Sequence, residues 1–190
     1  SGTTMRLLMG LVAGREVNAV FTGDPSLSNR PMERVAAPLR TLGANISTSD
    51  GKPPVCVHAA SLTGTHVDTK VASAQVKSAI ILAALGADGE TTVTEPLKSR
   101  DHTERMLAAM GAEISSEGNA VTVRKSRLRA VDVEVPADIS SAAYFMALGA
   151  LRGETLCKNV GINPTRTGIL RVFDQINVRY RLENERTVCG

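Results

Sequence analysis

Short polar stretches stand at the starts of several helices that this sequence predicts. They are "SGTT" (1–4), "SAQ" (73–75), "SR" (99–100) and "DISS" (138–141). A helix N-terminus carries unpaired backbone N–H groups and a partial positive charge, and small or hydroxyl residues there let an anion approach closely. Four cationic side chains lie in or near these stretches: Arg6, Arg30, Lys77 and Arg100. The pattern therefore predicts sites for a small anionic ligand.

The same stretches also have a purely structural interpretation. Serine, threonine and aspartate are the preferred N-caps of ordinary helices. Lys77 lies one turn into its helix and could extend its ammonium group to solvent, and Arg100 could pair with Glu104 four residues later. Arg30 fits this interpretation less well, because Pro31 suits the first turn of a helix and places Arg30 at its start. The spacing does not establish whether these helix starts converge.

The histidines and cysteines show no pattern of a metal or redox site. They are isolated from one another in the sequence: His58, His66, His102, Cys56, Cys157 and Cys189. Isolated cysteines are typical of buried or tolerated thiols in a reducing compartment. The sequence contains no Ser-His-Asp arrangement, no Walker loop and no GxGxxG, so we expect no metal and none of these catalytic motifs.

The composition excludes several classes of protein. The chain has 190 residues, a net charge of +3, 43% hydrophobic residues, 3% aromatic residues and no tryptophan. The charge is too small to favour nucleic acid, and few aromatic rings are available for stacking on bases. No apolar run reaches membrane-spanning length, and the first residues do not resemble a signal peptide. We expect a protein of the cytoplasm that binds neither nucleic acid nor a membrane.

A threefold internal repeat organises the chain. Residues 1–58, 72–124 and 138–190 each read as a helix, a strand, a second helix and two strands around a turn. The first helix of each repeat is small or apolar on nearly every side, which predicts burial all round. The second is amphipathic, with Thr103, Glu104 and Arg105 on the polar face of the middle repeat. This pattern predicts an α/β fold of stacked units, with a junction near residues 134–138, where "VDVEVP" reads as a strand.

Five motifs, in order along the chain, resemble one enzyme family. They are "SGTTMRLLMGLVAG", "TGDPSLSNRPMERV", "SAQVKSAIILAAL", "SRDHTERML" and "NPTRTGIL". They are similar to 5-enolpyruvylshikimate-3-phosphate (EPSP) synthase, or 3-phosphoshikimate 1-carboxyvinyltransferase. The resemblance implies an inside-out α/β repeat fold of βαβαββ-type units in two lobes, with helices in the middle and sheets outside. Residues 1–135 would form about two units of the first lobe, and residues 136–190 the first unit of the second, so that the two-lobe architecture is incomplete.

The resemblance also implies a reaction. The family transfers the enolpyruvyl group of phosphoenolpyruvate to the 5-hydroxyl of shikimate 3-phosphate and releases phosphate. This step of the shikimate pathway leads to chorismate and the aromatic amino acids. It uses no cofactor and no metal, and the phosphoenolpyruvate position is the target of glyphosate.

The first two motifs match the family's phosphoenolpyruvate contacts. By resemblance, Gly2 places its backbone against phosphoenolpyruvate, and Thr3 supports that turn. Arg30 in "RPM" corresponds to the arginine that binds the phosphoenolpyruvate anion. A guanidinium suits this role because its fork of N–H groups matches carboxylate or phosphate oxygens.

The next two motifs match the family's shikimate 3-phosphate contacts. By resemblance, Ser73 and Gln75 bind its phosphate and hydroxyl groups, and Gln75 lies close to both substrates. Ala74 stands where many members have serine, so we expect only its backbone to contribute. Ser99 and Arg100 are further contacts with shikimate 3-phosphate.

The family's acid and base residues fall outside the matched segment, so we expect no catalytic acid or base in this chain. One alternative is therefore an inactive or binding-only fragment, which would need the remaining segments of the same enzyme as its partner. A less favoured alternative is a UDP-N-acetylglucosamine enolpyruvyl transferase. That family has a reactive loop cysteine, whereas Cys56 lies in a predicted strand, "VCVH".

Overall fold

The computed structural model describes residues 1–188 and divides into two compact units. Unit 1 is Ser1–Ala130, and unit 2 begins at Val131. The sequence predicted a junction a few residues later, near residues 134–138. The assignment of the two segments to two lobes of a larger enzyme stays a prediction.

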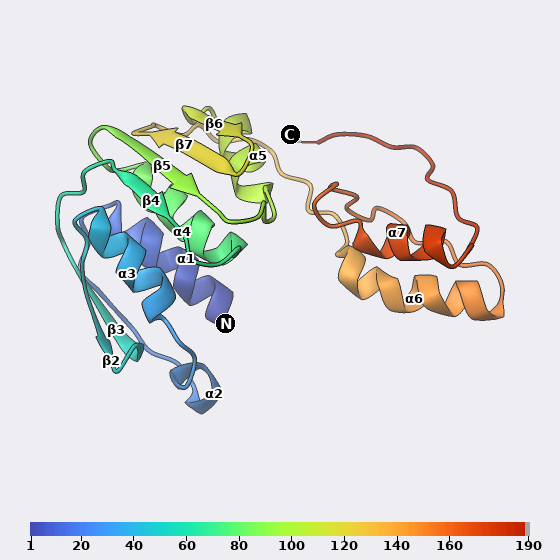
Figure 1. Ribbon diagram of the computed structural model, residues 1–190, viewed down its shortest axis with the longest axis horizontal. Coiled ribbons are helices and arrows are strands. Elements are labelled where there is room, and N and C mark those ends of the chain that lie inside the picture. Colours follow the sequence, from blue (N-terminus) through green and yellow to red (C-terminus); the bar gives the residue numbers. More distant parts are fainter. Residues whose placement is uncertain (189–190) are drawn as a thin grey trace. The chain divides into compact units, whose positions relative to one another are not determined.

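Unit 1 alternates helices and strands along the chain (Figure 1). Its helices are α1 (Gly2–Ala13), α2 (Pro25–Ser28), α3 (Glu33–Thr41), α4 (Ala74–Ala84) and α5 (His102–Ala109). Its strands are β1 (Ala19–Phe21), β2 (Asn45–Ser49), β3 (Lys52–His58), β4 (His66–Asp68), β5 (Glu90–Thr94), β6 (Ile114–Glu117) and β7 (Ala120–Arg124).

Two small sheets lie outside the helices of unit 1. The first has the strand order β1-β3-β2 and the second the order β4-β5-β7-β6. Only β4 and β5 run parallel; the other pairs in these sheets are antiparallel. In Figure 1, α1, α3 and α4 lie between the two sheets. The prediction of central helices with sheets outside is therefore confirmed for unit 1.

Helices α1 and α4 pack closely because glycine faces the backbone of α4. A methyl group at Gly10 would lie 2.0 Å from the carbonyl oxygen of Ala79, and one at Gly14 would lie 2.6 Å from that of Ala83. Such distances are far inside van der Waals contact, so only glycine allows this approach. The close contact fixes the relative position of the two helix starts.

Helix α4 is buried on nearly all sides, as the sequence predicted. One face, with Val76, Ala79 and Ile80, joins the core formed with α1, α3 and the first sheet. The opposite face, with Ile81 and Ala84, joins a smaller core under α5 and β7. Because α4 separates two cores, its polar residues can face only its N-terminal end or other buried polar groups.

The prediction for one residue of α5 was wrong. Glu104 was expected on the polar face, but it is 6% exposed and lies on the buried side with Leu107. The two residues are three positions apart and so share a helix face. Glu104 is tolerated there because Lys77 of α4 pairs with it.

Unit 2 contains α6 (Ile139–Arg152) and α7 (Gly168–Gln175). Strands were predicted in "VDVEVP", after Arg152 and near the C-terminal end. Among the described residues of this unit, only an isolated bridge between Ala137 and Val160 forms. Short alternating segments are not stable as strands unless neighbours extend the sheet.

The expected burial of α6 is also wrong for this chain. Tyr144 and Leu151 are each 81% exposed, whereas Ile139 and Ala142 are buried. Helix α4 is covered by sheets and helices, whereas no sheet covers α6 among the described residues of unit 2, and a pocket separates part of it from α7. Unit 2 therefore leaves apolar side chains in contact with solvent.

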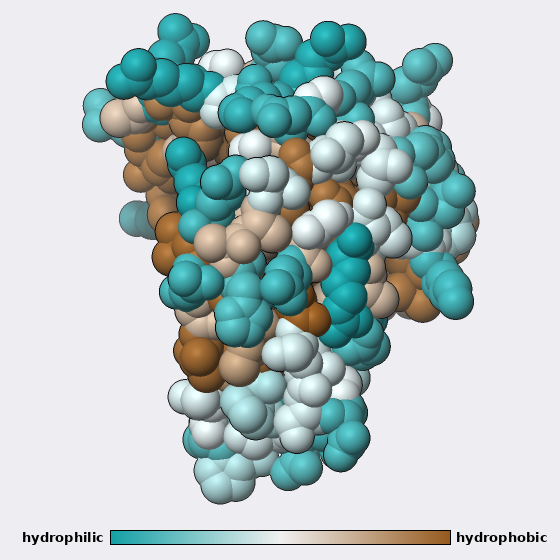
Figure 2. All heavy atoms as spheres, turned by 90° about the vertical axis from the view of Figure 1, so that its left-hand side faces the viewer, coloured by the Kyte–Doolittle hydropathy of each residue, from teal (hydrophilic) through white to brown (hydrophobic). Residues whose placement is uncertain are grey.

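Apolar groups also reach the surface elsewhere. Figure 2 shows a face on which brown apolar areas interrupt the teal hydrophilic surface. In unit 1, exposed examples are Val20 and Leu97. None of the helices in the described part of the chain is long and apolar enough to cross a membrane.

Candidate anion-binding site

The N-termini of α1 and α4 meet at Gln75. The side-chain nitrogen of Gln75 donates a hydrogen bond to Thr3 Oγ1 at 2.9 Å. Arg6 Nη1 donates to the side-chain oxygen of Gln75 at 2.6 Å. Because Thr3 and Gln75 lie in the first turns of their helices, the positive ends of both helix dipoles point to one place. The structure thus supplies the convergence that the spacing could not establish.

Arg6 is a buried cation with neutral partners. It is 3% exposed, and besides Gln75 it donates from Nη2 to the carbonyl oxygen of Pro31 at 3.1 Å. Its Nε is buried and has no hydrogen-bond partner among the described residues. A buried charge is stable only when it is paired or strongly hydrogen-bonded. An anion at the neighbouring helix starts would therefore stabilise Arg6.

Two further arginines increase the positive charge here. A methyl group on Gly2 would lie 3.1 Å from Nη1 of Arg30 and 3.5 Å from Nη1 of Arg6, so both guanidinium groups lie against the first turn of α1. Burial lowers the pKa of the Arg6 guanidinium below its ordinary value, and the charges of Arg34 and Arg30 lower it further. The three arginine side chains together create a positive potential that attracts anions.

Of the helix starts at "SGTT", "SAQ" and "DISS", side-chain capping explains only the last. Ser1 and Ser73 occupy the N-cap positions of α1 and α4, but neither makes a side-chain capping hydrogen bond. By contrast, Asp138 caps α6 by accepting from the backbone N–H of Ser140 at 3.1 Å. The "SGTT" and "SAQ" stretches are therefore not explained by side-chain capping from their N-cap residues.

The second pair of predicted contacts is joined to the first through Glu95. Glu95 Oε1 accepts from the backbone N–H of Ser73 at 3.1 Å. Glu95 Oε2 accepts from the N–H of Ser99 at 3.2 Å and from its hydroxyl at 2.8 Å. Arg100 is exposed in the segment before α5. The structure thus links Ser73 and Ser99, and places Arg100 beside them in the chain.

Both structural interpretations of Lys77 and Arg100 are wrong. Lys77 does not extend to solvent: its side chain is 1% exposed and its Nζ lies 3.0 Å from Glu95 Oε2. The ammonium group also lies 2.7 Å from Glu104 Oε1, so Glu104 pairs with Lys77 in place of Arg100. The cause is the burial of α4 between two cores, which leaves no path to solvent for this side chain.

The sequence analysis missed Glu95, placed Glu104 on an exposed face, and treated Arg6 only as a nearby cation. Two signals were available. Arg6 and Lys77 are charged residues inside otherwise apolar helices, a position that requires a partner. Glu104 shares a helix face with Leu107, which marked it as a candidate for burial.

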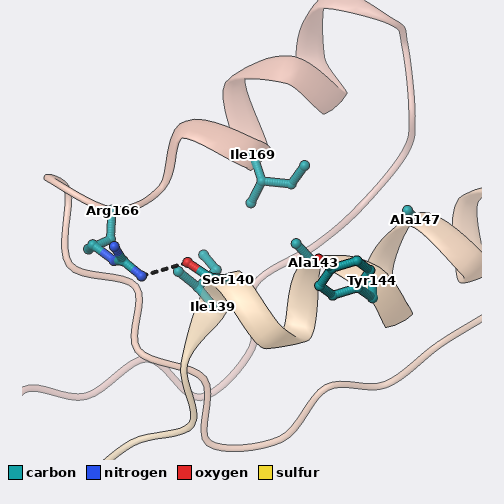
Figure 3. A pocket seen from close by; sticks show the side chains of 7 residues that line it. All are labelled: Ile139, Ser140, Ala143, Tyr144, Ala147, Arg166 and Ile169. Atoms are coloured by element: carbon teal, nitrogen blue, oxygen red, sulfur yellow. Dashed lines mark hydrogen bonds between the residues drawn. The ribbon is translucent and has the colours of Figure 1, made fainter. Parts of the chain in front are cut away.

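Unit 2 has a separate pocket of about 460 Å³ between α6 and α7. In Figure 3 the side chains of Ile139, Ala143 and Tyr144 line it from α6, with Ile169 on the opposite side. Arg166 Nη2 donates to Ser140 Oγ at 2.6 Å and to Asp138 Oδ1 at 2.8 Å. The cation of this pocket therefore already has a carboxylate partner, unlike Arg6.

Side chains that could bind a metal are not grouped in the described part of the chain. Among residues 1–188, no cluster of histidine, cysteine, aspartate and glutamate could hold a metal ion. Cys56 and Cys157 are free thiols, and Cys189 lies outside the described residues.

Comparison with known proteins identifies the family to which this geometry belongs. The family model described as EPSP synthase (3-phosphoshikimate 1-carboxyvinyltransferase) matches residues 1–187. The 3-phosphoshikimate 1-carboxyvinyltransferase of Desulfitobacterium hafniense (strain DSM 10664 / DCB-2) is 52% identical over 195 residues, which cover 100% of this chain and 45% of the relative. That of Bacillus subtilis (strain 168) is 48% identical over 188 residues, covering 96% of this chain and 44% of the relative.

The fold agrees with the same family. A solved structure of EPSP synthase from Acinetobacter baumannii superimposes with a TM-score of 0.91 and 49% sequence identity, covering 100% of this chain and 44% of that chain. The chain therefore spans less than half the length of the relatives it matches.

Proposed function

Because the chain belongs to the EPSP synthase (3-phosphoshikimate 1-carboxyvinyltransferase) family, we propose that it is part of a transferase acting on phosphoenolpyruvate and shikimate 3-phosphate. The enolpyruvyl group moves to the 5-hydroxyl of shikimate 3-phosphate, and phosphate is released. The reaction belongs to the shikimate pathway, towards chorismate and the aromatic amino acids. It takes place in the cytoplasm without cofactor or metal.

One observation carries the proposal: the buried Arg6, with neutral partners, lies where two helix N-termini meet. Both substrates are anions, and this place combines helix dipoles, two guanidinium groups and backbone N–H groups. The fixed donors need no rearrangement when an anion arrives, and this preorganisation favours both binding and charge stabilisation during the reaction.

The phosphoenolpyruvate contacts are Gly2, Thr3 and Arg30. Gly2 brings the backbone of α1 close to the ligand, and the Arg30 guanidinium lies against Gly2. A side chain larger than hydrogen at Gly2 would press on both Arg30 and the ligand. Thr3 accepts a hydrogen bond from the amide group of Gln75 and so orients the residue that we expect close to both substrates.

The shikimate 3-phosphate contacts are Ser73, Ala74, Gln75, Ser99 and Arg100. Ala74 contributes its backbone N–H at the first residue of α4. Gln75 has its oxygen held by Arg6 and one amide hydrogen held by Thr3, so its second amide hydrogen is available to a substrate oxygen. Arg100 is exposed and can reach an incoming phosphate.

The chain supplies binding and charge stabilisation, and the acid and base come from other segments of the enzyme. The addition of the 5-hydroxyl to phosphoenolpyruvate needs a base for the hydroxyl proton and an acid for the methylene carbon. None of the contacts named above is suited to either role. The isolated chain should therefore bind shikimate 3-phosphate without turning it over.

A calorimetric titration of the 190-residue chain tests this proposal, with shikimate as the matched control that lacks only the phosphate. Saturable binding of shikimate 3-phosphate, with much weaker binding of shikimate, supports it. Equal affinity for the two ligands, or no binding by the folded chain, contradicts the anion site. Phosphate release from the isolated chain with both substrates present would contradict the external acid and base.

A further inference from the structure

The buried Lys77–Glu95–Glu104 network occupies the space behind the predicted shikimate 3-phosphate contacts. It contains three ionisable side chains from three segments: Lys77 from α4, Glu95 from the residue after β5 and Glu104 from α5. The side chains of Lys77 and Glu95 are each 1% exposed, and that of Glu104 is 7% exposed. Neither the family resemblance nor the reaction assigns a role to these residues.

Glu95 is the point at which the two serine-bearing segments are joined. One of its oxygens receives the N–H of Ser73, and the other receives the N–H and hydroxyl of Ser99. No direct contact between the two segments is needed, because a single planar carboxylate fixes the distance between them.

The hydroxyl of Ser99 is already used. A serine hydroxyl has one proton to donate, and Ser99 donates it to Glu95. A phosphate group accepts hydrogen bonds and offers few protons in return. In the ligand-free chain Ser99 therefore holds its segment in place, and its hydroxyl must turn away from Glu95 to donate to a phosphate oxygen.

Lys77 offsets part of the negative charge of the two carboxylates. An uncompensated carboxylate directly behind Ser73 and Ser99 would repel an anionic ligand. The Lys77 ammonium lies 3.0 Å from Glu95 Oε2 and removes much of this repulsion. It also ties Glu95 to Glu104, and so to the helix that follows Arg100.

We propose that Glu95, supported by Lys77, is a positioning residue that sets the spacing of segments 73–75 and 99–100 for binding a phosphate ester. This rests on the proposed function, since the ligand is shikimate 3-phosphate. Glu95 does not touch the ligand; it acts through Ser73 and Ser99.

The variant Glu95→Gln tests the proposal, and Glu104→Gln is its matched control. Both make the same chemical change in the same network and leave Lys77 with one carboxylate. The amide of Glu95→Gln has one accepting oxygen, so it can hold only one of the two segments. Glu104→Gln leaves all contacts of Glu95 with Ser73 and Ser99 in place.

Two measurements are made on the 190-residue chain and its variants. Amide hydrogen exchange without ligand should be faster at Ser73 or Ser99 in Glu95→Gln and unchanged at both in Glu104→Gln. The Kd for shikimate 3-phosphate should rise at least about tenfold in Glu95→Gln and less than about twofold in Glu104→Gln. Equal exchange and equal Kd in the two variants would overturn the proposal.

The proposed function and the positioning role of Glu95 can fail separately. If the folded wild-type chain does not bind shikimate 3-phosphate, the proposed function fails, and exchange alone decides whether Glu95 couples the segments. If Glu95→Gln does not fold, Glu95→Asp replaces it, because it keeps the charge opposite Lys77 but is too short to reach both segments. An unchanged Kd in Glu95→Asp contradicts the proposal in the same way.

Discussion

Replacing Lys77 with methionine should strongly destabilise unit 1. Methionine fills a similar space, but the change leaves the carboxylates of Glu95 and Glu104 buried without their cation. Removing one partner of a buried ion pair costs about 3–5 kcal/mol, mainly because of the charge left behind. For a unit of this size, such a loss corresponds to a fall in the unfolding midpoint of roughly 10–20 °C.

Lys125→Met is the matched control for this experiment. Lys125 Nζ lies 2.6 Å from Asp88 Oδ1, which is closer than the Lys77 contacts, yet both side chains are largely exposed. Pairs of this kind contribute little because water screens them, so the midpoint should hardly move. Thermal unfolding followed by circular dichroism near neutral pH measures both variants.

A third variant isolates the charge from the packing. In Lys77→Met combined with Glu95→Gln and Glu104→Gln, no buried charge is left alone, and most of the lost stability should return. The reasoning is refuted if Lys77→Met unfolds at the same temperature as Lys125→Met, since burial would then have no effect on the value of an ion pair.

Three further variants test other parts of the account. Arg6→Met should raise the Kd for shikimate 3-phosphate at least about tenfold, because a charge-assisted contact is worth about 1.5–3 kcal/mol. The unfolding midpoint should not fall. Calorimetry measures the Kd and thermal unfolding the midpoint, and an unchanged Kd would contradict the role of Arg6. Gly10→Ala should destabilise unit 1 by about 3 kcal/mol in urea unfolding, since its methyl would lie 2.0 Å from the Ala79 carbonyl oxygen; an unchanged midpoint counts against the close helix contact. The hydrogen bond from Arg40 lowers the pKa of Glu33 below its ordinary value, so its contribution is present above the unfolded pKa and lost as the pH falls through the folded one. Glu33→Gln should therefore destabilise near neutral pH and not in strong acid, and an equal effect at both would refute the pairing.

Local patterns were sufficient to predict most of unit 1. The helix over α1, the two strands around a turn that end the first repeat, and the burial of α4 all follow from local residue patterns and apolar spacing. These features depend on residues close together in sequence. The resemblance then correctly implied how the helices and sheets are layered.

The pairing of buried charges could not be predicted in this way. Lys77 meets Glu95 and Glu104 from separate segments, 18 and 27 residues away along the chain. Helical spacing offered only local partners, which led to the wrong pairing of Glu104 with Arg100. Long-range packing decides such contacts, and no local pattern records it.

In unit 2, local patterns predicted burial and strands that the structure does not show. The apolar spacing of α6 predicts burial, yet Tyr144 and Leu151 are largely exposed. Alternation in "VDVEVP" likewise predicts a strand, but a strand forms only with a partner. An apolar pattern indicates which face of a segment can be buried. Whether that face is buried depends on whether another part of the protein packs against it.

The central claim is that the starts of α1 and α4 form one anion site. The most direct test is a titration of the ¹⁵N-labelled 190-residue chain with shikimate 3-phosphate, following the amide signals of Thr3 and Gln75. The account predicts that both signals, on separate helices, shift together and saturate at a single Kd. Shifts confined to one helix, or two different Kd values, would contradict a shared site.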